Sequence, residues 1–190
     1  MMKKVLLLLH PGVEEIEAVT AIDLLRRAGI EVMAVSVISD LEVMGGRGIT
    51  LKADAQLSAD PKRAFETFEA FDMLVIPGGP GVDELRKHPG VLELVRRFHR
   101  EDRWIAAICA APLVLLDAGI VAGHVLTSFP SAEGELRPKV KAYVSERVVR
   151  DGKLVTSRGA GTAEEFSLAL IEILSGPETA EETRKRIVAR

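Results

Sequence analysis

The stretch that decides the fold is Arg103-Trp104-Ile105-Ala106-Ala107-Ile108-Cys109-Ala110-Ala111-Pro112-Leu113, which holds the only cysteine of the 190-residue chain. Its apolar run, Trp104–Ile108, has the length and the continuous hydrophobicity of a buried strand. From Ala110 onward the residues favour a helix, because Pro112 is tolerated in a first helical turn. The pattern therefore predicts that Cys109 lies on a turn between a strand and a helix.

Two roles are open to a cysteine at such a turn. The turn exposes a nucleophile and points it at the first N–H groups of the helix, whose dipole favours a thiolate and lowers the thiol pKa. A free cysteine is also one of the residue types most often buried, where it acts as a small apolar side chain. This stretch alone does not separate a reactive Cys109 from a structural one.

Upstream of this stretch, we predict strands at residues 3–9 and 31–38 and a helix between them at residues 14–28. Such a βαβ unit predicts a parallel sheet with a right-handed crossover. In the helix, we expect an apolar stripe to face the core, formed by Ile16, Val19, Ile22 and Leu25.

The rest of the chain continues to alternate strands with helices. Strands are expected at 49–52, 73–76, 125–128, 142–144, 148–149 and 154–156. Helices are expected at 60–68 and 91–101, from a capping box at 162–165 through residue 174, and from a second capping box at 179–182 onward. The predicted fold class is α/β, with a doubly wound, mostly parallel sheet in three layers, and residues 1–190 forming one domain.

Composition narrows the class of protein. The chain is 47% hydrophobic and 28% charged, with a net charge of −3, which is typical of a soluble globular protein. No basic stripe is interleaved with aromatic residues, so we expect no nucleic-acid partner. The apolar run near the N-terminus is too short to span a bilayer and lacks a cleavage pattern, so no membrane association is expected. A single cysteine fits a reducing, cytoplasmic location.

Three loops are expected to meet at one edge of the sheet, because each follows the carboxyl end of a parallel strand. These loops cover residues 10–17, 77–82 and 109–110. The middle loop has the sequence Pro-Gly-Gly-Pro-Gly, and the N–H groups of Gly78 and Gly79 could form an oxyanion hole together with that of Ala110. Metal-ligand spacings of histidine and cysteine are absent, so no metal is expected.

The first of these loops carries acidic residues. Glu14, Glu15 and Glu17 fall in the first helical turn, where carboxylates ordinarily complement the helix dipole. Glu17 follows Ile16 of the expected buried stripe, so its carboxyl can turn inward. If burial kept this carboxyl protonated, it would donate a hydrogen bond to the Cys109 thiolate and lower the thiol pKa.

Several segments in order along the chain resemble the DJ-1/ThiJ/PfpI superfamily, and most closely its DJ-1 branch with the bacterial YajL-like proteins. They are Gly-Val-Glu-Glu-Ile-Glu-Ala-Val at 12–19, Arg-Arg-Ala-Gly-Ile at 26–30, Pro-Gly-Gly at 77–79, Ala-Ala-Ile-Cys-Ala-Ala-Pro at 106–112 and Thr-Ser-Arg-Gly-Ala-Gly-Thr at 156–162. The resemblance extends to about Leu174 and favours a reactive Cys109. It implies a flavodoxin-like sandwich, usually a homodimer, that needs no cofactor.

The resemblance also implies roles for particular residues. Cys109 matches the low-pKa nucleophile, and Glu17 matches the protonated glutamate that contacts it. Gly79 and Ala110 match residues whose amides line an anion pocket, and Arg47 matches an arginine near the pocket and the dimer interface. The implied activity is that of a glutathione-independent glyoxalase or deglycase acting on methylglyoxal, glyoxal and their adducts. The alternative is a redox sensor or chaperone regulated by oxidation of the cysteine.

Two departures from relatives bear on mechanism. Phe129 stands where some DJ-1 relatives have a histidine near the cysteine, which leaves proton transfer to Glu17, to water or to His10. His10 is the only histidine expected at the functional edge. Ala110 stands where the protease branch has a histidine directly after the cysteine, so a cysteine protease is disfavoured.

Overall fold

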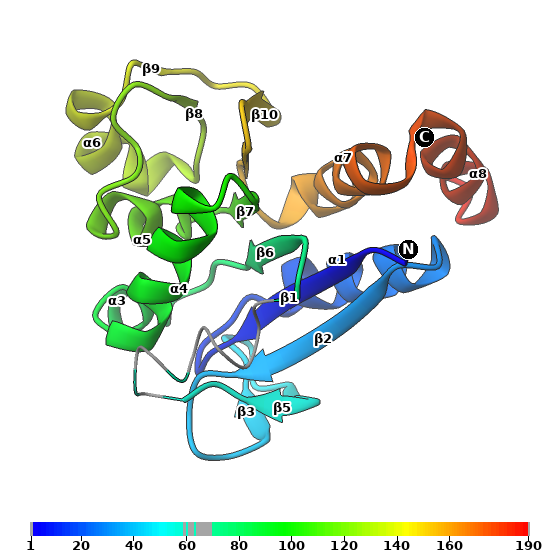
Figure 1. Ribbon diagram of the computed structural model, residues 1–190, viewed down its shortest axis with the longest axis horizontal. Coiled ribbons are helices and arrows are strands. Elements are labelled where there is room, and N and C mark those ends of the chain that lie inside the picture. The colour runs from blue at the N-terminus through cyan, green and yellow to red at the C-terminus, as the bar shows by residue number, and fades with distance from the viewer. Residues whose placement is uncertain (1, 59, 61–62, 64–69, 190) are drawn as a thin grey trace.

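The computed structural model (Figure 1) describes residues 2–58, 60, 63 and 70–189. The helix expected over residues 60–68 falls mostly outside these residues. The strands of the main sheet are β1 (Lys4–Leu9), β2 (Glu31–Ser36), β5 (Ala55–Gln56), β6 (Met73–Ile76), β7 (Trp104–Ile108), β10 (Val148–Asp151) and β11 (Leu154–Ser157). The α-helices are α1 (Glu15–Arg27), α3 (Val82–Leu85), α4 (Pro89–Arg100), α5 (Pro112–Asp117), α6 (Glu133–Leu136), α7 (Ala163–Ser175) and α8 (Pro177–Arg186).

The main sheet has the strand order β10-β11-β7-β6-β1-β2-β5. Each neighbouring pair is parallel except β10 with β11, which form an antiparallel hairpin at one edge. This confirms the predicted α/β class with a mostly parallel sheet. The strands expected near residues 125 and 142 do not join it, because β8 (Val125–Leu126) pairs with β9 (Ala142–Tyr143) in a separate two-stranded sheet. A hairpin of β3 (Glu42–Met44) and β4 (Thr50–Lys52) is also separate.

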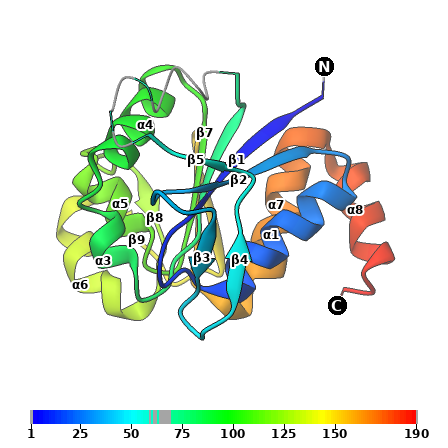
Figure 2. The same ribbon diagram turned by 90° about the horizontal axis from the view of Figure 1, so that it is seen from below.

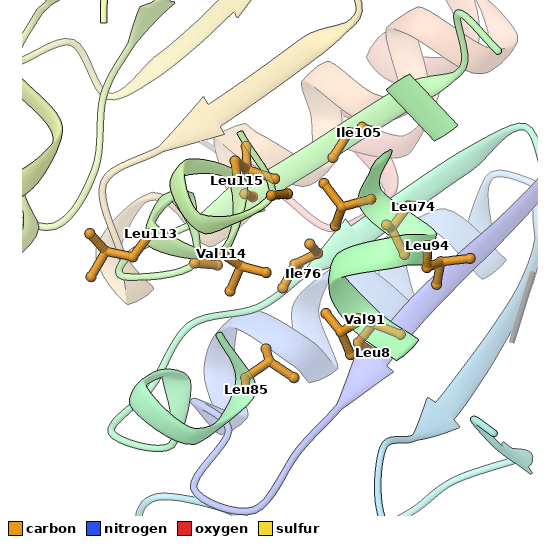
Figure 3. Packing of buried hydrophobic residues seen from close by; sticks show 14 of the residues in the cluster. Leu8, Leu74, Ile76, Leu85, Val91, Leu94, Ile105, Leu113, Val114 and Leu115 are labelled. Atoms are coloured by element: carbon orange, nitrogen blue, oxygen red, sulfur yellow. The ribbon is translucent and has the colours of Figure 1, made fainter. Parts of the chain in front are cut away.

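Helices cover both faces of the sheet, and Figure 2 shows α3, α4, α5 and α6 on one side and α1, α7 and α8 on the other. Between the sheet and the first group of helices lies a core of fully buried aliphatic side chains (Figure 3). Ile76 from β6 faces Val91 of α4 and Val114 of α5 in this layer. The apolar runs of β6 and β7 have the bounds predicted from the sequence, since buried parallel strands need apolar residues on both faces.

The expected apolar stripe of α1 is confirmed at Leu25, which is buried, and Ile22 is partly buried, but the stripe is wrong at Ile16 and Val19. Ile16 and Val19 are 56% and 47% exposed, whereas Ala18, Ala21 and the leucines at positions 24 and 25 are buried. The buried face packs against α7, and the small alanines allow the two helices to approach closely. The buried face of α1 is therefore rotated relative to the expected stripe, and it also includes Glu15 and Glu17.

The two expected capping boxes are also absent. The hydroxyl of Thr162 makes no cap bond to α7 and instead bonds the backbone of Gly159 and, at 2.6 Å, the Ser157 hydroxyl. Helix α8 begins at Pro177. The hydroxyl of Thr179, in its first turn, donates to the carbonyl of Ser175, the last residue of α7. Side-chain hydroxyls often take such local alternatives to a helix cap.

Candidate active site

The three loops expected at one edge of the sheet do meet there. Strands β7, β6 and β1 are neighbours, so the loops that follow their carboxyl ends are adjacent. They surround a cavity of about 510 Å³. Among the proposed site residues, those lining the cavity are Glu17, Arg47, Gly79, Cys109 and Ala110. Gly78 is not among the lining residues.

Cys109 occupies the predicted turn after β7, and α5 begins three residues later with Pro112 as its first residue. Its φ of 65° lies in the left-handed region, which non-glycine residues seldom adopt. Two backbone bonds hold this conformation: the N–H of Cys109 donates to Ser157 at 2.9 Å, and the Cys109 carbonyl accepts from Phe129 at 2.8 Å. A strained residue held from both sides is typical of a functional position.

The carboxyl of Glu17 lies beside the thiol. Its Oε2 accepts a 2.8 Å hydrogen bond from the N–H of Gly78. Glu17 is 1% exposed, Oε1 is buried with no hydrogen-bond partner among the described residues, and the carboxyl interacts with the thiol of Cys109. Burial, with the nearby charge of Glu14, raises the pKa of Glu17 to about 7 against the opposing hydrogen bond from Gly78. The inward Glu17 expected from the sequence is found, although its supposed buried neighbour Ile16 is exposed.

The lowered thiol pKa was expected for Cys109 beside a protonated Glu17, and beside the ionised carboxylate the pKa of the thiol is raised instead. Burial raises the pKa of the Cys109 thiol to about 12, and the charge and hydrogen bond of the Glu17 carboxylate add to this rise. The N–H groups of Ala110 and Gly79 oppose it. The two effects of the carboxylate vanish when Glu17 takes up a proton, so thiol and carboxyl titrate as a coupled pair.

The backbone around the thiol can hold an anion. The N–H groups of Gly79 and Ala110 both point at the sulfur of Cys109, which matches two of the three expected oxyanion-hole donors. The N–H of Gly78 is already committed to Glu17, so its expected role as a third donor is not supported. Gly79 has a φ of +112°, and a Cβ there would collide with the carbonyl of Gly12, so this donor requires glycine.

Arg47 reaches the cavity from the tip of the β3–β4 hairpin. The buried carboxyl of Glu15 fixes this tip, because its Oε1 accepts the N–H of Arg47 at 2.6 Å and that of Ile49 at 3.4 Å. Burial tends to raise the pKa of Glu15, but these backbone bonds and the Arg47 charge outweigh it and the pKa is lowered. That Glu15 fixes the hairpin tip could not be predicted from the sequence, since nothing local separates it from an ordinary acid in a first helical turn.

His10 does not reach the cavity, contrary to its expected place in proton transfer. Its ring is 1% exposed, with Nδ1 3.1 Å from the carbonyl of Pro11 and Nε2 3.3 Å from that of Pro77. Burial lowers the pKa of His10 against these carbonyl contacts. The imidazole links the loops after β1 and β6 and does not face the thiol.

The outer wall of the cavity includes two carboxylates that no sequence pattern marked, together with Phe129, the residue at the position of the histidine of some relatives. Asp83 and Glu135 contribute carboxylates, and Phe129 contributes a ring that is 45% exposed. Arg86 holds Glu135 in place with a 2.9 Å ion pair and also binds Asp117. These partners lie in separate elements, so no sequence motif joins them.

Two further properties concern the described residues as a whole. Across residues 2–58, 60, 63 and 70–189, no group of three or more histidine, cysteine, aspartate or glutamate side chains is arranged to hold a metal ion. No helix in this part of the chain combines the length and apolar character needed to cross a bilayer.

Comparisons with known proteins identify the family of this chain. The DJ-1/PfpI family profile matches residues 3–173. Protein dj-1beta of Drosophila melanogaster is 38% identical over 189 residues, covering 99% of this chain and 98% of that protein. The glutathione-independent glyoxalase DJR-1.2 of Caenorhabditis elegans is 36% identical over 177 residues, covering 93% of this chain and 91% of its own.

Solved structures of DJ-1 proteins are also similar to this chain. The crystal structure of Drosophila melanogaster DJ-1beta superposes with a TM-score of 0.92 at 38% identity and covers 100% of both chains. Oxidised Toxoplasma gondii DJ-1 superposes with a TM-score of 0.90 at 34% identity and covers 98% of each chain. The flavodoxin-like sandwich implied by the resemblance is thereby confirmed. The chain belongs to the DJ-1/PfpI family and, within it, to the DJ-1 branch.

Proposed function

We propose that this chain is a cysteine-dependent glyoxalase that acts, without a cofactor, on small dicarbonyls such as methylglyoxal and glyoxal. The observation that carries the proposal is the position of the Cys109 sulfur, between the Glu17 carboxyl and the N–H groups of Gly79 and Ala110. A nucleophile, a proton carrier and an oxyanion hole thus face one cavity. A relative named as a glutathione-independent glyoxalase supports the same activity.

The first step would be addition of the Cys109 thiolate to the aldehyde carbon. A carbon–sulfur bond forms, the carbonyl electron pair moves to oxygen, and the protonated carboxyl of Glu17 delivers a proton to that oxygen. The N–H groups of Gly79 and Ala110 stabilise the negative charge as it develops. The product of this step is a hemithioacetal.

The second step would be an isomerisation of the hemithioacetal by proton transfer. The Glu17 carboxylate removes the proton from the former aldehyde carbon, which gives an enediol, and returns it to the neighbouring carbonyl carbon. The hydroxyl proton of the former aldehyde carbon passes to the oxygen of that neighbouring carbon, which leaves a thioester of a 2-hydroxy acid. Water then cleaves the thioester and restores the thiol, so the net reaction adds one water to the dicarbonyl. One carbon is oxidised while its neighbour is reduced, so no external oxidant or reductant is consumed.

The same thiolate could attack early adducts of a dicarbonyl with an amine or thiol, which is the deglycase form of the activity. The cavity of about 510 Å³ exceeds the volume of methylglyoxal and lies open beside the exposed ring of Phe129. We therefore place small aldehydes and their adducts in one substrate class.

A thiol that must stay reduced favours a cytoplasmic location.

The test measures lactate formed from methylglyoxal without glutathione, for the wild type, Cys109→Ala and Glu17→Gln. We expect both variants to lose at least about 100-fold in turnover, since each removes a group that bonds to the reacting atoms or moves their protons. Glu164→Gln, a change on the exposed side of α7, serves as the matched control and should keep wild-type turnover. Full activity in Cys109→Ala would overturn the proposal.

The second candidate function is redox sensing. Peroxide would oxidise the Cys109 thiolate in two steps to a sulfinate, with one water released from each peroxide. The Glu17 carboxyl and the two backbone N–H groups would stabilise this anion, and the solved Toxoplasma gondii relative is an oxidised form. Intact mass after mild peroxide should show two added oxygens in the wild type and none in Cys109→Ala. Absent glyoxal turnover together with this adduct would favour the sensor.

We also propose that the protein is a homodimer whose interface includes the N-terminal turns of α1 and the β3–β4 hairpin. Ile16 and Val19 of α1 and Met44 and Ile49 of the hairpin are each at least 47% exposed. The Glu15 bond to the N–H of Ile49 brings the two elements together. Large apolar side chains gathered on one face favour a covered surface, and a second copy of this chain is the partner that the family resemblance implies.

A further inference from the structure

A second cavity, of about 390 Å³, lies at the opposite edge of the sheet from Cys109. Trp104, the first residue of β7, forms part of its wall, whereas Cys109 follows the last residue of that strand. At about 3.3 Å per residue, five residues separate the two positions by about 16 Å. The second cavity is therefore independent of the proposed glyoxalase site.

Two cations lie against the ring of Trp104 in this cavity. The guanidinium carbon of Arg150 is 4.7 Å from the ring centroid, and Nζ of Lys153 is 4.5 Å from it. Arg150 lies on β10, and Lys153 lies in the two-residue turn between β10 and β11. In the described part of the chain, no carboxylate lies within 4.0 Å of either cation. A cation held on an aromatic face keeps its N–H groups free for an anion.

Two imidazoles complete this wall. The rings of His99 from α4 and His124 from the loop before β8 meet edge to face, with centroids 6.2 Å apart. Nδ1 of His124 is buried without a hydrogen-bond partner among the described residues. Its nearest carboxylate oxygen, Oδ2 of Asp151, is 3.5 Å away and already accepts the N–H of Val125 at 2.7 Å. Within the part of the chain that the structure describes, this ring nitrogen therefore has one long contact, to a carboxylate already engaged elsewhere, and no hydrogen bond of its own.

We propose that this cavity binds a small anion that carries one or two phosphate groups. Asp102 is the one carboxylate among the lining residues described, against the two cations of Arg150 and Lys153 and two imidazoles. Several donors around one space suit a ligand with many acceptor oxygens, and phosphate meets that need. The volume admits pyrophosphate and the diphosphate end of a nucleotide.

The cavity carries its own reporter, because Trp104 is the only tryptophan of the chain. Sodium pyrophosphate is titrated into the wild type at constant ionic strength, with sodium sulfate as the control anion. We expect a saturable change in tryptophan fluorescence with pyrophosphate and at least a tenfold weaker response to sulfate. A second titration with ADP separates a free phosphate ligand from a nucleotide, since tighter binding of ADP would require contacts to its nucleoside.

Variants distinguish a binding site from a contact that merely fixes the hairpin. By calorimetry, Arg150→Gln and Lys153→Gln should each weaken pyrophosphate binding at least tenfold, whereas Lys153→Arg, which keeps the charge, should retain it. Lys52→Gln removes the same charge from the exposed strand β4 and should bind as the wild type does. Thermal melts confirm that each variant is folded.

Two results would overturn this proposal. One is the absence of saturable binding by the wild type in the millimolar range. The other is equal affinity for pyrophosphate in Lys153→Gln and in the wild type. That result would mean that the two cations only stabilise the hairpin. Methylglyoxal turnover should be unchanged in Lys153→Gln, so the outcome does not depend on the proposed glyoxalase activity.

Discussion

The N–H of Gly78 donates a hydrogen bond of 2.8 Å to Oε2 of Glu17, and this bond ties the end of β6 to the first turn of α1. It leaves Oε1 of the carboxyl for the thiol of Cys109. A Cβ at position 78 would lie 2.6 Å from the Cβ of Cys109 and 2.9 Å from the carbonyl oxygen of Ile108. Position 78 therefore acts through packing and through Glu17, and it does not donate to the substrate.

Gly78→Ala should lower both stability and turnover, because the added methyl group forces the turn at Cys109 to shift. Overpacking of this kind costs about 1–3 kcal/mol in the free energy of unfolding. Gly134→Ala is the matched control, since a Cβ there meets nothing within 4 Å and falls in helix α6. Urea unfolding and lactate formation measure the two effects. Wild-type values for Gly78→Ala would contradict the geometry of the turn.

The raised pKa of Glu17 should make the protein less stable as the pH rises. The folded chain keeps this proton up to about pH 7, whereas the unfolded carboxyl loses it near 4.5. Between these values the unfolded state binds fewer protons, so the free energy of unfolding falls with increasing pH, by roughly 3 kcal/mol in total at about 1.4 kcal/mol per pH unit. Glu17→Gln removes this dependence and should be more stable than the wild type at pH 8.

Urea unfolding of the wild type and Glu17→Gln at pH 5 and pH 8 checks this expectation. Subtracting the two proteins isolates Glu17, because every other titrating group is common to both. The stability difference should grow in favour of Glu17→Gln from pH 5 to pH 8. An equal difference at the two pH values would show that the carboxyl is not protonated in the folded chain.

The sheet and the turn at Cys109 could be predicted from sequence because their signals are local. Strands β6 and β7 are continuous apolar runs ended by glycines or by Cys109, and buried parallel strands need that pattern. The face that α1 buries could not be predicted, since it depends on the packing partner. Two alanines face α7 while Ile16 points outward, an arrangement that hydrophobic periodicity alone assigns in reverse.

The site residues, too, fall into those that local sequence predicts and those that depend on distant partners. Cys109, Gly79 and Ala110 come from short motifs whose backbone geometry follows from their own sequence. The roles of Glu15 and Gly78 depend on partners 32 and 61 residues away, which no local pattern marks. The sequence predicts a lowered pKa for Cys109 only beside a protonated Glu17, whereas burial and the charge of the Glu17 carboxylate raise the pKa of the thiol.

Arg86 should matter more for stability than its place near the surface implies. Its side chain is 16% exposed and binds both Asp117 and Glu135, and these bonds raise its pKa above the ordinary arginine value. Arg86→Ala leaves the partly buried carboxylate of Asp117 and the exposed one of Glu135 without their cation, so we expect a loss of about 1 kcal/mol in the free energy of unfolding. Lys87→Ala removes an exposed i,i+3 pair and should change it by less than about 0.5 kcal/mol. Equal effects from chemical denaturation would contradict a structural role for Arg86.

The proposed dimer should depend on the exposed apolar face of α1 and the β3–β4 hairpin. Light scattering of the wild type should give twice the 20.6 kDa of one chain. Ile49→Glu places a charge where the second copy would exclude water, so it should weaken association by about 100-fold or more. Val188→Glu, at a valine 87% exposed near the C-terminus, makes the same change outside this face and should leave the dimer intact. A monomeric wild type, or a dimer that survives Ile49→Glu as well as Val188→Glu, would assign this face to another partner.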